Sequence, residues 1–201
     1  DLAEDLSRRR RAASKEFAVQ VEAHLAQLAM AKTRFDVRFR DDHSGEDAWS
    51  DRGIDQAEFF LSANVGEDLR PLTRIVSGGE LSRLMLALKT MATAQGAGKT
   101  LIFDEVDAGI GGEVADVVGR KLQQLGERFQ VICITHLAQI AVYADAHFRV
   151  QKSVERGRTR SEIVRLSAEE EREEIARMLG GIEIGKETRA AAREMLKSAR
   201  R

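Results

Sequence analysis

The chain has 201 residues, of which 43% are hydrophobic, 32% charged and 5% aromatic. This length suffices for one or two domains with a buried core, and the scarcity of aromatic residues and proline favours a helix-rich protein. The formal net charge of −1 excludes a global field that would draw the chain to nucleic acid or to an anionic membrane. No apolar run approaches the roughly 18 residues of a membrane span. The single cysteine, Cys133, excludes an internal disulfide and is compatible with a reducing, cytoplasmic setting.

The N-terminal residues predict one long helix. Residues 1–34 contain neither glycine nor proline, and apolar side chains recur at helical spacing along one stripe. The stripe consists of Leu2, Leu6, Ala13, Phe17, Val21, Leu25 and Leu28. At the rise of an α-helix it would extend for roughly 50 Å, which suits the end of a coiled-coil arm entering a head. Because the chain opens inside this pattern and without a methionine, we expect it to be a piece of a longer protein.

Two short stretches after this helix predict an antiparallel hairpin. Residues 35–39 alternate between apolar and polar side chains, and residues 54–63 form a second candidate strand. The polar segment 41–53 predicts a mobile loop, to whose Trp49 we assign no role.

From residue 77 onward, helices alternate with apolar strands. We expect helices over 77–95, 113–125 and 137–144, separated by strands over 100–103 and 129–135. The apolar face predicted for the first helix consists of Leu81, Leu84, Met85, Leu88 and Met91. Strands that are apolar throughout predict a mainly parallel sheet covered by helices on both faces, and hence an α/β fold. The remaining residues predict a closing hairpin over 146–152 and 160–166, turning at Gly157, and helices over 168–179 and 186–199.

Two glycines open the first of these helices. Ser77-Gly78-Gly79-Glu80 fits a capping box, in which Ser77 caps the helix and Glu80 is its third residue. A capping box has no need of glycine, which costs up to about 1 kcal/mol in helix propensity relative to alanine. Bare N–H groups at a helix start also form a site that a phosphate can approach closely. The motif by itself supports both interpretations.

Paired carboxylates follow the first apolar strand. Acidic residues are common after strands, but Asp104 and Glu105 lie at the carboxyl edge, where ligands bind in open α/β sheets. The two side chains face differently, so one can serve Mg²⁺ through its water shell while the other polarises a water molecule. We expect Asp107, Gly109 and Gly111 to shape the loop beyond.

A histidine ends the second apolar strand. A lone histidine is more often structural than catalytic. Here, however, the strand of His136 should lie beside that of Asp104, with both ends at one edge. From this edge an imidazole could contact a γ-phosphate or the water that attacks it.

Two further features give weaker signals. Gly98-Lys99-Thr100 has the letters that end a phosphate loop, but Thr93 stands at the first glycine position and the segment leads into a strand. The late hairpin is basic and could touch DNA phosphates, although acidic neighbours favour a solvated hairpin. Its cations are Arg149, Lys152, Arg156, Arg158 and Arg160.

Together these motifs resemble the C-terminal half of an ATP-binding-cassette (ABC) ATPase head. More narrowly, the chain resembles the bacterial RecN family, DNA double-strand-break repair ATPases of the structural-maintenance-of-chromosomes (SMC) class. Residues 77–83 correspond to the signature motif, 101–105 to the Walker B strand, 106–112 to the D-loop and His136 to the switch histidine. The likeness extends over residues 35–196, and Glu80 replaces the glutamine usual in transporters.

The resemblance implies a division into the end of a coiled-coil arm, residues 1–34, and the C-terminal half of a head, residues 35–201. It implies ATP and Mg²⁺ as cofactors, both of which need an N-terminal half that carries Walker A, so this chain alone should be inactive. The implied partners are that N-terminal half, a second head in a homodimer, and DNA, in particular double-strand ends, but no membrane. The implied location is the cytoplasm, at the nucleoid.

The resemblance also assigns roles to residues. The signature residues that would bind ATP across the dimer are Ser77, Gly78, Gly79 and Glu80, and the D-loop residues are Asp107 and Gly109. Asp104 would hold Mg²⁺ through water, Glu105 would be the general base, and His136 would sense the γ-phosphate. Hydrolysis would open the dimer and release the grip of the arms on DNA.

Two other classes of protein remain open. The nucleotide-binding subunit of an ABC transporter would share the motifs, but the long N-terminal helix and Glu80 argue against it. A structural dimerisation module without hydrolysis would keep the scaffold, but the intact Asp104, Glu105 and His136 argue against that class.

Overall fold

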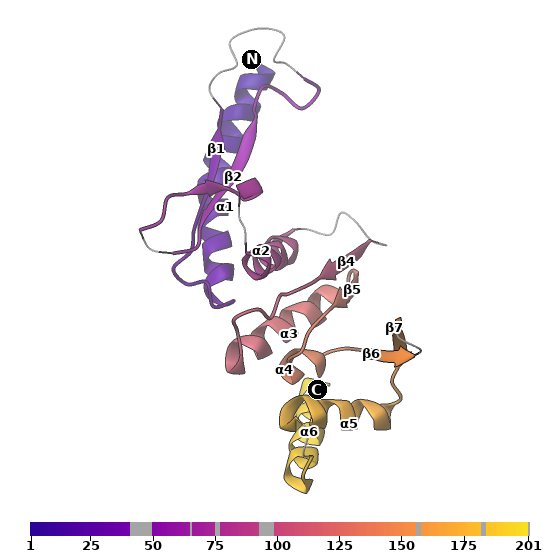
Figure 1. The fold of residues 1–201 in the computed structure, drawn as a ribbon. Helices are drawn as coiled ribbons and strands as arrows, with labels where there is room; N and C mark the ends of the chain where they lie inside the picture. The colour runs from indigo at the N-terminus through magenta and orange to yellow at the C-terminus, as the bar shows by residue number, and fades with distance from the viewer. Residues whose placement is uncertain are drawn as a thin grey trace. The chain divides into compact units, whose positions relative to one another are not determined.

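The computed structural model describes residues 1–40, 50–64, 66–74, 77–92, 99–155, 158–181 and 184–200 (Figure 1). The chain divides into two compact units, Asp1–Thr93 and Ala94–Arg201. This division does not test the expected boundary near residue 34 between an arm and a head, which stays a prediction. Trp49, Gly98, Arg156 and Gly157 lie outside the described residues. No helix in the described ranges is both long enough and apolar enough to cross a membrane.

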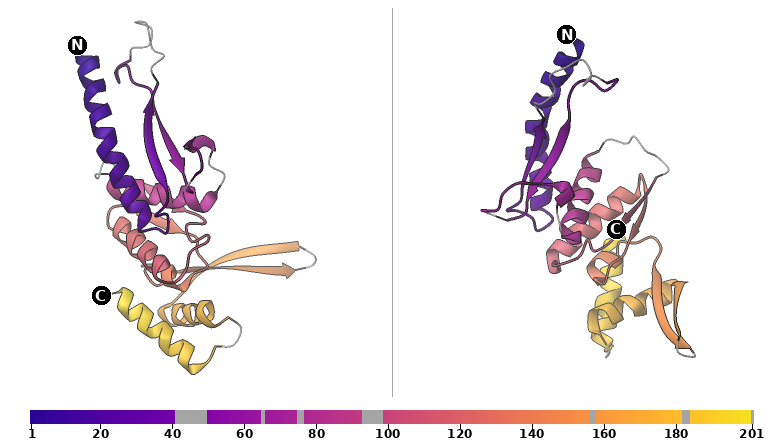
Figure 2. Two further views of the ribbon diagram at one scale, coloured as in Figure 1. Left: turned by 90° about the vertical axis from the view of Figure 1, so that its left-hand side faces the viewer. Right: turned by 45° about the horizontal axis from the view of Figure 1, so that its top comes forward.

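The first unit pairs a long helix with an antiparallel sheet (Figure 2). Helix α1, Leu2–Ala26, packs against strand β1, Arg34–Phe39, which pairs along its whole length with β2, Ala57–Ser62. A short strand β3, Arg70–Pro71, joins the other edge of β2 and leads into the 3₁₀ turn η2, Leu72–Arg74. The long helix and the antiparallel hairpin are confirmed.

The core of the first unit lies at the C-terminal part of α1. Val21, Leu25 and Leu28 are fully buried, whereas Leu2 at the other end of the stripe is 89% exposed. The helix ends earlier than predicted because Ala29 takes a left-handed conformation, with φ of +60°. The N–H of Met30 then donates a hydrogen bond to the carbonyl of Leu25, which closes the end of the helix.

Aromatic and polar contacts attach α1 to the rest of this unit. The rings of Phe17, Phe35 and Phe59 lie 5.3–5.9 Å apart between centroids. Nearer the N-terminus, Ser7 Oγ donates to Asp55 Oδ1 at 2.6 Å and Arg10 pairs with Asp55 Oδ2 at 3.2 Å. The carboxylate of Asp55 is only 4% exposed, so these two donors compensate its loss of water.

Helix α2, Gly78–Met91, completes the first unit and packs against α1. Its buried apolar residues are Leu84, Leu86 and Ala87. The predicted apolar face was partly wrong, because Leu81 and Met85 are 37% and 38% exposed.

The second unit contains a β-α-β element. Strands β4, Thr100–Phe103, and β5, Gln130–Cys133, are parallel and in register from Thr100↔Gln130 to Phe103↔Cys133. Helix α3, Gly112–Gly126, connects them, and the short helix α4, Ala138–Ala141, follows β5. The α/β class and the parallel pairing are confirmed.

The parallel sheet is less covered than predicted. In the described ranges it has two strands, while the other two sheets are antiparallel. Ile102, Ile132 and Ile134 are 67%, 46% and 57% exposed, so one face of β4–β5 is open within this chain, whereas Phe103 on the other face is buried.

A hairpin and two helices end the second unit. Strands β6, Phe148–Glu155, and β7, Arg158–Arg165, pair antiparallel as predicted, and α5, Ala168–Gly180, and α6, Lys186–Ala199, follow. Helix α5 begins with a capping box between Ser167 and Glu170. Its buried residues pack with α4 and α6 in a core of Ala138, Ala141, Val142, Ile175, Ala176, Ala192, Leu196 and Ala199.

Candidate functional site at the ends of the parallel strands

The ends of β4 and β5 bring together four of the predicted site residues. Both strands run in the same direction, and the N–H of Ile134 donates to the carbonyl of Phe103 at 2.9 Å, which extends the pairing to the edge. Asp104 and Glu105 leave this edge from β4, and His136 leaves it from β5. The side chains of all three are exposed, so the edge is open to a ligand.

The turn after β4 has an unusual backbone. Glu105 has a φ of +55°, one of two non-glycine residues in the described ranges with a positive φ. The turn is closed by hydrogen bonds from the N–H of Ala108 to the carbonyl of Glu105 at 3.0 Å and from the N–H of Ile110 to the carbonyl of Asp107 at 3.3 Å. Gly109 follows with a φ of +73°, where glycine is strain-free. A left-handed non-glycine residue stores strain, and such residues cluster at functional sites.

Asp107 lies at the centre of the hydrogen bonds between the two strand ends. Its Oδ2 accepts hydrogen bonds from Thr135 Oγ1 at 2.6 Å and from the backbone N–H of His136 at 2.9 Å. His136 Nδ1 lies 3.0 Å from the same oxygen, as an ion-pair contact. The carboxylate is 5% exposed, whereas the imidazole of His136 is 76% exposed. Asp107 therefore connects the turn after β4 to the end of β5 and orients the ring.

The same edge carries negative charge next to a thiol. Burial, followed by the carboxylates of Asp107 and Asp104, raises the pKa of Cys133 to about 12. The thiol is therefore neutral at physiological pH and is no candidate nucleophile. The negative charge of these carboxylates favours a bound cation over an anion at this edge.

The residues present fit a magnesium ion held through water, and not a dehydrated metal centre. The described residues contain no group of three or more His, Cys, Asp or Glu side chains that could hold a metal ion. Mg²⁺ keeps several waters and needs only one or two carboxylates in addition to substrate phosphates. The exposed Asp104, with Glu105 beside it, meets that requirement.

The predicted signature motif belongs to the first unit, whereas the strand-end residues belong to the second. Ser77 caps α2, and its Oγ accepts from the N–H of Glu80 at 3.4 Å. Gly78 is exposed and Gly79 is buried. One turn further on, Arg83 is 7% exposed, and burial lowers the pKa of its guanidinium while Glu80 opposes that shift. The first half of the capping box is thus present, and it is compatible with either interpretation of the glycines.

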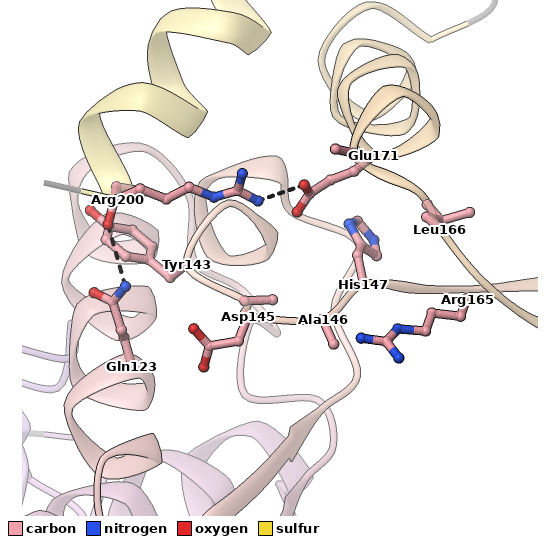
Figure 3. Close-up of a pocket in the computed structure, with 12 residues that line it drawn as sticks. Gln123, Tyr143, Asp145, Ala146, His147, Arg165, Leu166, Glu171 and Arg200 are labelled. Carbon is pink, nitrogen blue, oxygen red and sulfur yellow. Dashed lines mark hydrogen bonds and ion pairs between the residues drawn. The ribbon is translucent and has the colours of Figure 1, made fainter.

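A hollow of about 680 Å³ lies elsewhere in the second unit (Figure 3). Its wall includes Tyr143, His147 and Arg165, together with an ion pair of Glu171 and Arg200 at 2.5 Å. None of the predicted site residues lines it. This hollow is therefore separate from the candidate site, whose residues lie at the ends of β4 and β5.

Sequence reasoning missed two features of the site. Thr135 was not a candidate, although a hydroxyl beside a strand-end histidine is a signal that could have been used. Asp107 was assigned to a loop, but its burial and its two hydrogen bonds depend on a contact with the end of β5 that no local pattern encodes.

Two parallel strands that end together in carboxylates and a histidine define an α/β protein with a candidate cation and acid–base site at the sheet edge. Comparison with known proteins identifies the class of protein more narrowly. The chain is 46% identical over 198 residues to the DNA repair protein RecN of Treponema pallidum, covering 98% of this chain and 35% of that protein. It is 38% identical over 208 residues to RecN of Bacillus subtilis, covering 98% and 36%, and 50% identical over 144 residues to RecN of Xylella fastidiosa, covering 72% and 26%.

The chain is therefore homologous to the C-terminal part of RecN. The alignments to the Treponema and Bacillus proteins include nearly all of this chain but only about a third of each relative. No family model matches it. Among solved structures, an Smc head domain with a coiled coil and joint from Pyrococcus yayanosii is 18% identical with a TM-score of 0.48, covering 92% of this chain and 29% of that chain. A likeness at that level is too weak to support an argument.

Proposed function

We propose that this chain supplies the C-terminal half of the ATPase head of an SMC-like protein that acts in recombinational repair of DNA double-strand breaks. The observation that carries the proposal is the convergence of Asp104, Glu105 and His136 at one sheet edge, connected through Asp107. ATP hydrolysis by in-line attack needs a metal ion, an oriented water and stabilisation of the γ-phosphate. This edge offers one residue for each requirement.

The proposed roles follow from the chemistry of each side chain. Asp104 holds Mg²⁺ through its water shell, and the metal neutralises charge on the phosphates when it is bound. Glu105 accepts the proton of the attacking water, since an exposed carboxylate next to the metal site is able to do so. His136 contacts the γ-phosphate or the attacking water from the neighbouring strand.

The signature motif acts in trans in this proposal. Ser77, Gly78, Gly79 and Glu80 present the N-terminus of α2, whose free N–H groups favour an anion. A second copy of the head would deliver the γ-phosphate to them, and the D-loop residues Asp107 and Gly109 would lie at the same dimer contact. Homodimerisation therefore depends on ATP.

An N-terminal half of the same head completes the fold in this proposal. Ile102, Ile132 and Ile134 leave one face of β4–β5 open, and apolar parallel strands are ordinarily covered on both faces. The relatives are about three times as long as this chain. This difference supports a further segment of the longer protein that packs on the open face of β4–β5. That segment would also bring Walker A. The role in DNA repair, and double-strand ends as the DNA partner, rest on the RecN relatives.

The trans arrangement is tested with Ser77→Arg in the longer protein. The arginine places bulk and charge where the γ-phosphate of the partner must enter, so ATP-driven dimerisation and turnover should be lost while nucleotide binding by the monomer remains. Loss of the N-cap itself costs about 0.5–2 kcal/mol. Ser167→Arg is the matched control, because Ser167 also caps a helix, α5, but is not among the predicted site residues, so its loss should leave turnover intact.

The measurement is the ATPase rate as a function of the mixing ratio with a Walker A variant, with light scattering to follow dimers. We expect Ser77→Arg alone to be inactive and the mixture to recover at most one active site per heterodimer. Normal turnover by Ser77→Arg alone would mean that the glycines are only a capped helix start. Absence of turnover in the unmodified protein would favour a structural dimerisation module.

A further inference from the structure

Asp107 is buried, and its Oδ2 atom accepts two hydrogen bonds from the end of β5. His136 Nδ1 lies 3.0 Å from the same oxygen. A carboxylate with 5% exposure needs such compensation. An ionised carboxylate presents only lone pairs, so a ring nitrogen held at this distance is favoured with a hydrogen atom over a bare lone pair.

The direction of the hydrogen bonds around Thr135 agrees with this assignment. Thr135 Oγ1 accepts from the backbone N–H of Leu137 at 3.0 Å, which leaves its own hydrogen for Asp107 at 2.6 Å. The backbone N–H of His136 is a donor by its nature and lies at 2.9 Å. Nδ1 of His136 lies 3.0 Å from the same oxygen, and the repulsion between a bare lone pair and the carboxylate favours a hydrogen atom on this nitrogen.

We propose that Asp107 is a positioning residue that holds neutral His136 as the tautomer with hydrogen on Nδ1, so that Nε2 faces the site as an acceptor. A neutral imidazole has one N–H, and the partner of one ring nitrogen decides the state of the other. The backbone bond from His136 to the same oxygen fixes the position of the ring as well as its tautomer.

The consequence, which rests on the proposed function, concerns what His136 can do with ATP. In its neutral form the ring accepts a hydrogen bond at Nε2 from a water or from a protonated phosphate oxygen. It donates to an unprotonated γ-phosphate oxygen only after it has taken up a second proton. Asp107 therefore sets the order in which His136 can exchange protons with the reacting groups.

The test is ¹⁵N NMR of the histidine rings in this 201-residue chain without nucleotide, at the alkaline end of the ring titration. His136→Gln assigns the signals among the four histidines. We expect the Nδ1 resonance of His136 at the protonated, pyrrole-like position and the Nε2 resonance at the pyridine-like position. In Asp107→Ala the two resonances should shift toward values averaged over both tautomers. The Nε2–H tautomer should become the major one.

Thr135→Val is the matched control, because it removes one donor from Asp107 and leaves the ring contact in place. It should keep the Nδ1–H tautomer. The proposal is overturned if His136 in the unmodified chain carries its hydrogen on Nε2, or if a folded Asp107→Ala keeps the Nδ1–H form. If Asp107→Ala fails to fold, the spectra of the unmodified chain and of Thr135→Val decide the outcome by themselves.

This measurement separates the two proposals because it needs neither ATP nor a partner. An Nδ1–H tautomer in a protein without ATPase activity would contradict the proposed function alone. An active ATPase with the Nε2–H tautomer would contradict only the role of Asp107.

Discussion

At the scale of single residues, the site depends on conformations that cost free energy. Glu105 holds a left-handed backbone, with φ of +55°, and Asp107 is a buried carboxylate. Neither state is favourable for an isolated residue. Each persists because the surrounding turn and the end of β5 supply hydrogen bonds, as the two donors to Asp107 show.

The strain at Glu105 predicts that Glu105→Gly stabilises the chain. Glycine adopts the observed φ without steric cost, and we expect the free energy of unfolding to rise by up to about 1 kcal/mol despite the greater freedom of the unfolded chain. Urea unfolding of the 201-residue chain measures the effect. Glu105→Gln keeps the strain and serves as the control, with no expected change. A Glu105→Gly chain less stable than this control would show that the turn is unstrained.

A buried ion pair makes stability depend on pH. Glu174 is 5% exposed and accepts two hydrogen bonds from Arg177, at 2.6 and 3.0 Å. These bonds lower the pKa of Glu174 from its ordinary value, against the opposing effect of burial. Because the pKa in the folded state is depressed, the stabilisation is complete above the unfolded value of about 4.3 and is lost as the pH falls through the folded value.

We therefore expect Glu174→Gln to lower the free energy of unfolding at pH 7 by about 1–2 kcal/mol, as for one charge-assisted hydrogen bond. At a pH below both pKa values the difference from the unmodified chain should largely vanish. Unfolding curves at the two pH values measure it. An equal difference at both would mean that shape, and not charge, is what Glu174 contributes.

At the scale of elements, periodicity predicted helices and strands well where one face differs from the other. The bounds of α6 agree with the prediction, and β4 lies where residues 100–103 were expected. The buried face of α2 was predicted less well, because Leu84, Met85, Leu86 and Leu88 follow one another closely and the pattern does not select one side. Packing against α1 decides it.

The open face of β4–β5 gives a prediction at this scale. Ile102 is exposed and Phe103 is 4% exposed, although they are neighbours in one strand. In this chain Ile102→Ser should change the free energy of unfolding by less than about 0.5 kcal/mol. Phe103→Ser should cost about 3–5 kcal/mol, as for other large-to-small core changes.

The same Ile102→Ser change should weaken association with the N-terminal segment of the longer protein, measured by co-purification of the two parts expressed separately. A Thr100→Ser chain, changed in the same strand at an exposed position, controls for strand effects. Unaltered association would show that this face is not where the segment binds.

At the scale of the whole molecule, the two groups of predicted site residues fall into different units of the chain. Ser77–Glu80 belong to the first and Asp104–His136 to the second. The sequence predicted both groups of residues because each follows a helix start or a strand end. It did not predict the burial of Asp107, which arises from contacts with the end of β5, a segment distant in the chain. It did not predict the left-handed conformation of Glu105 either, because no local pattern marks a non-glycine residue for that conformation.

The incompleteness of the site predicts that this chain alone binds labelled ATP weakly and does not hydrolyse it. Addition of the N-terminal segment that carries Walker A should restore turnover. Micromolar affinity together with measurable hydrolysis by the 201-residue chain would contradict the half-head proposal.

The most direct test of the ATPase proposal is the turnover of the longer protein with Glu105→Gln. The amide fills the same space but cannot accept the proton of the attacking water, so ATP binding should be retained while the rate falls by about 10²–10⁴. ATP-bound dimers should accumulate, which size-exclusion chromatography with light scattering detects. Asp107 and His136 remain unchanged in this variant, so the defect isolates the general base. Unchanged turnover by Glu105→Gln would show that Glu105 is only an exposed acid at the end of a strand.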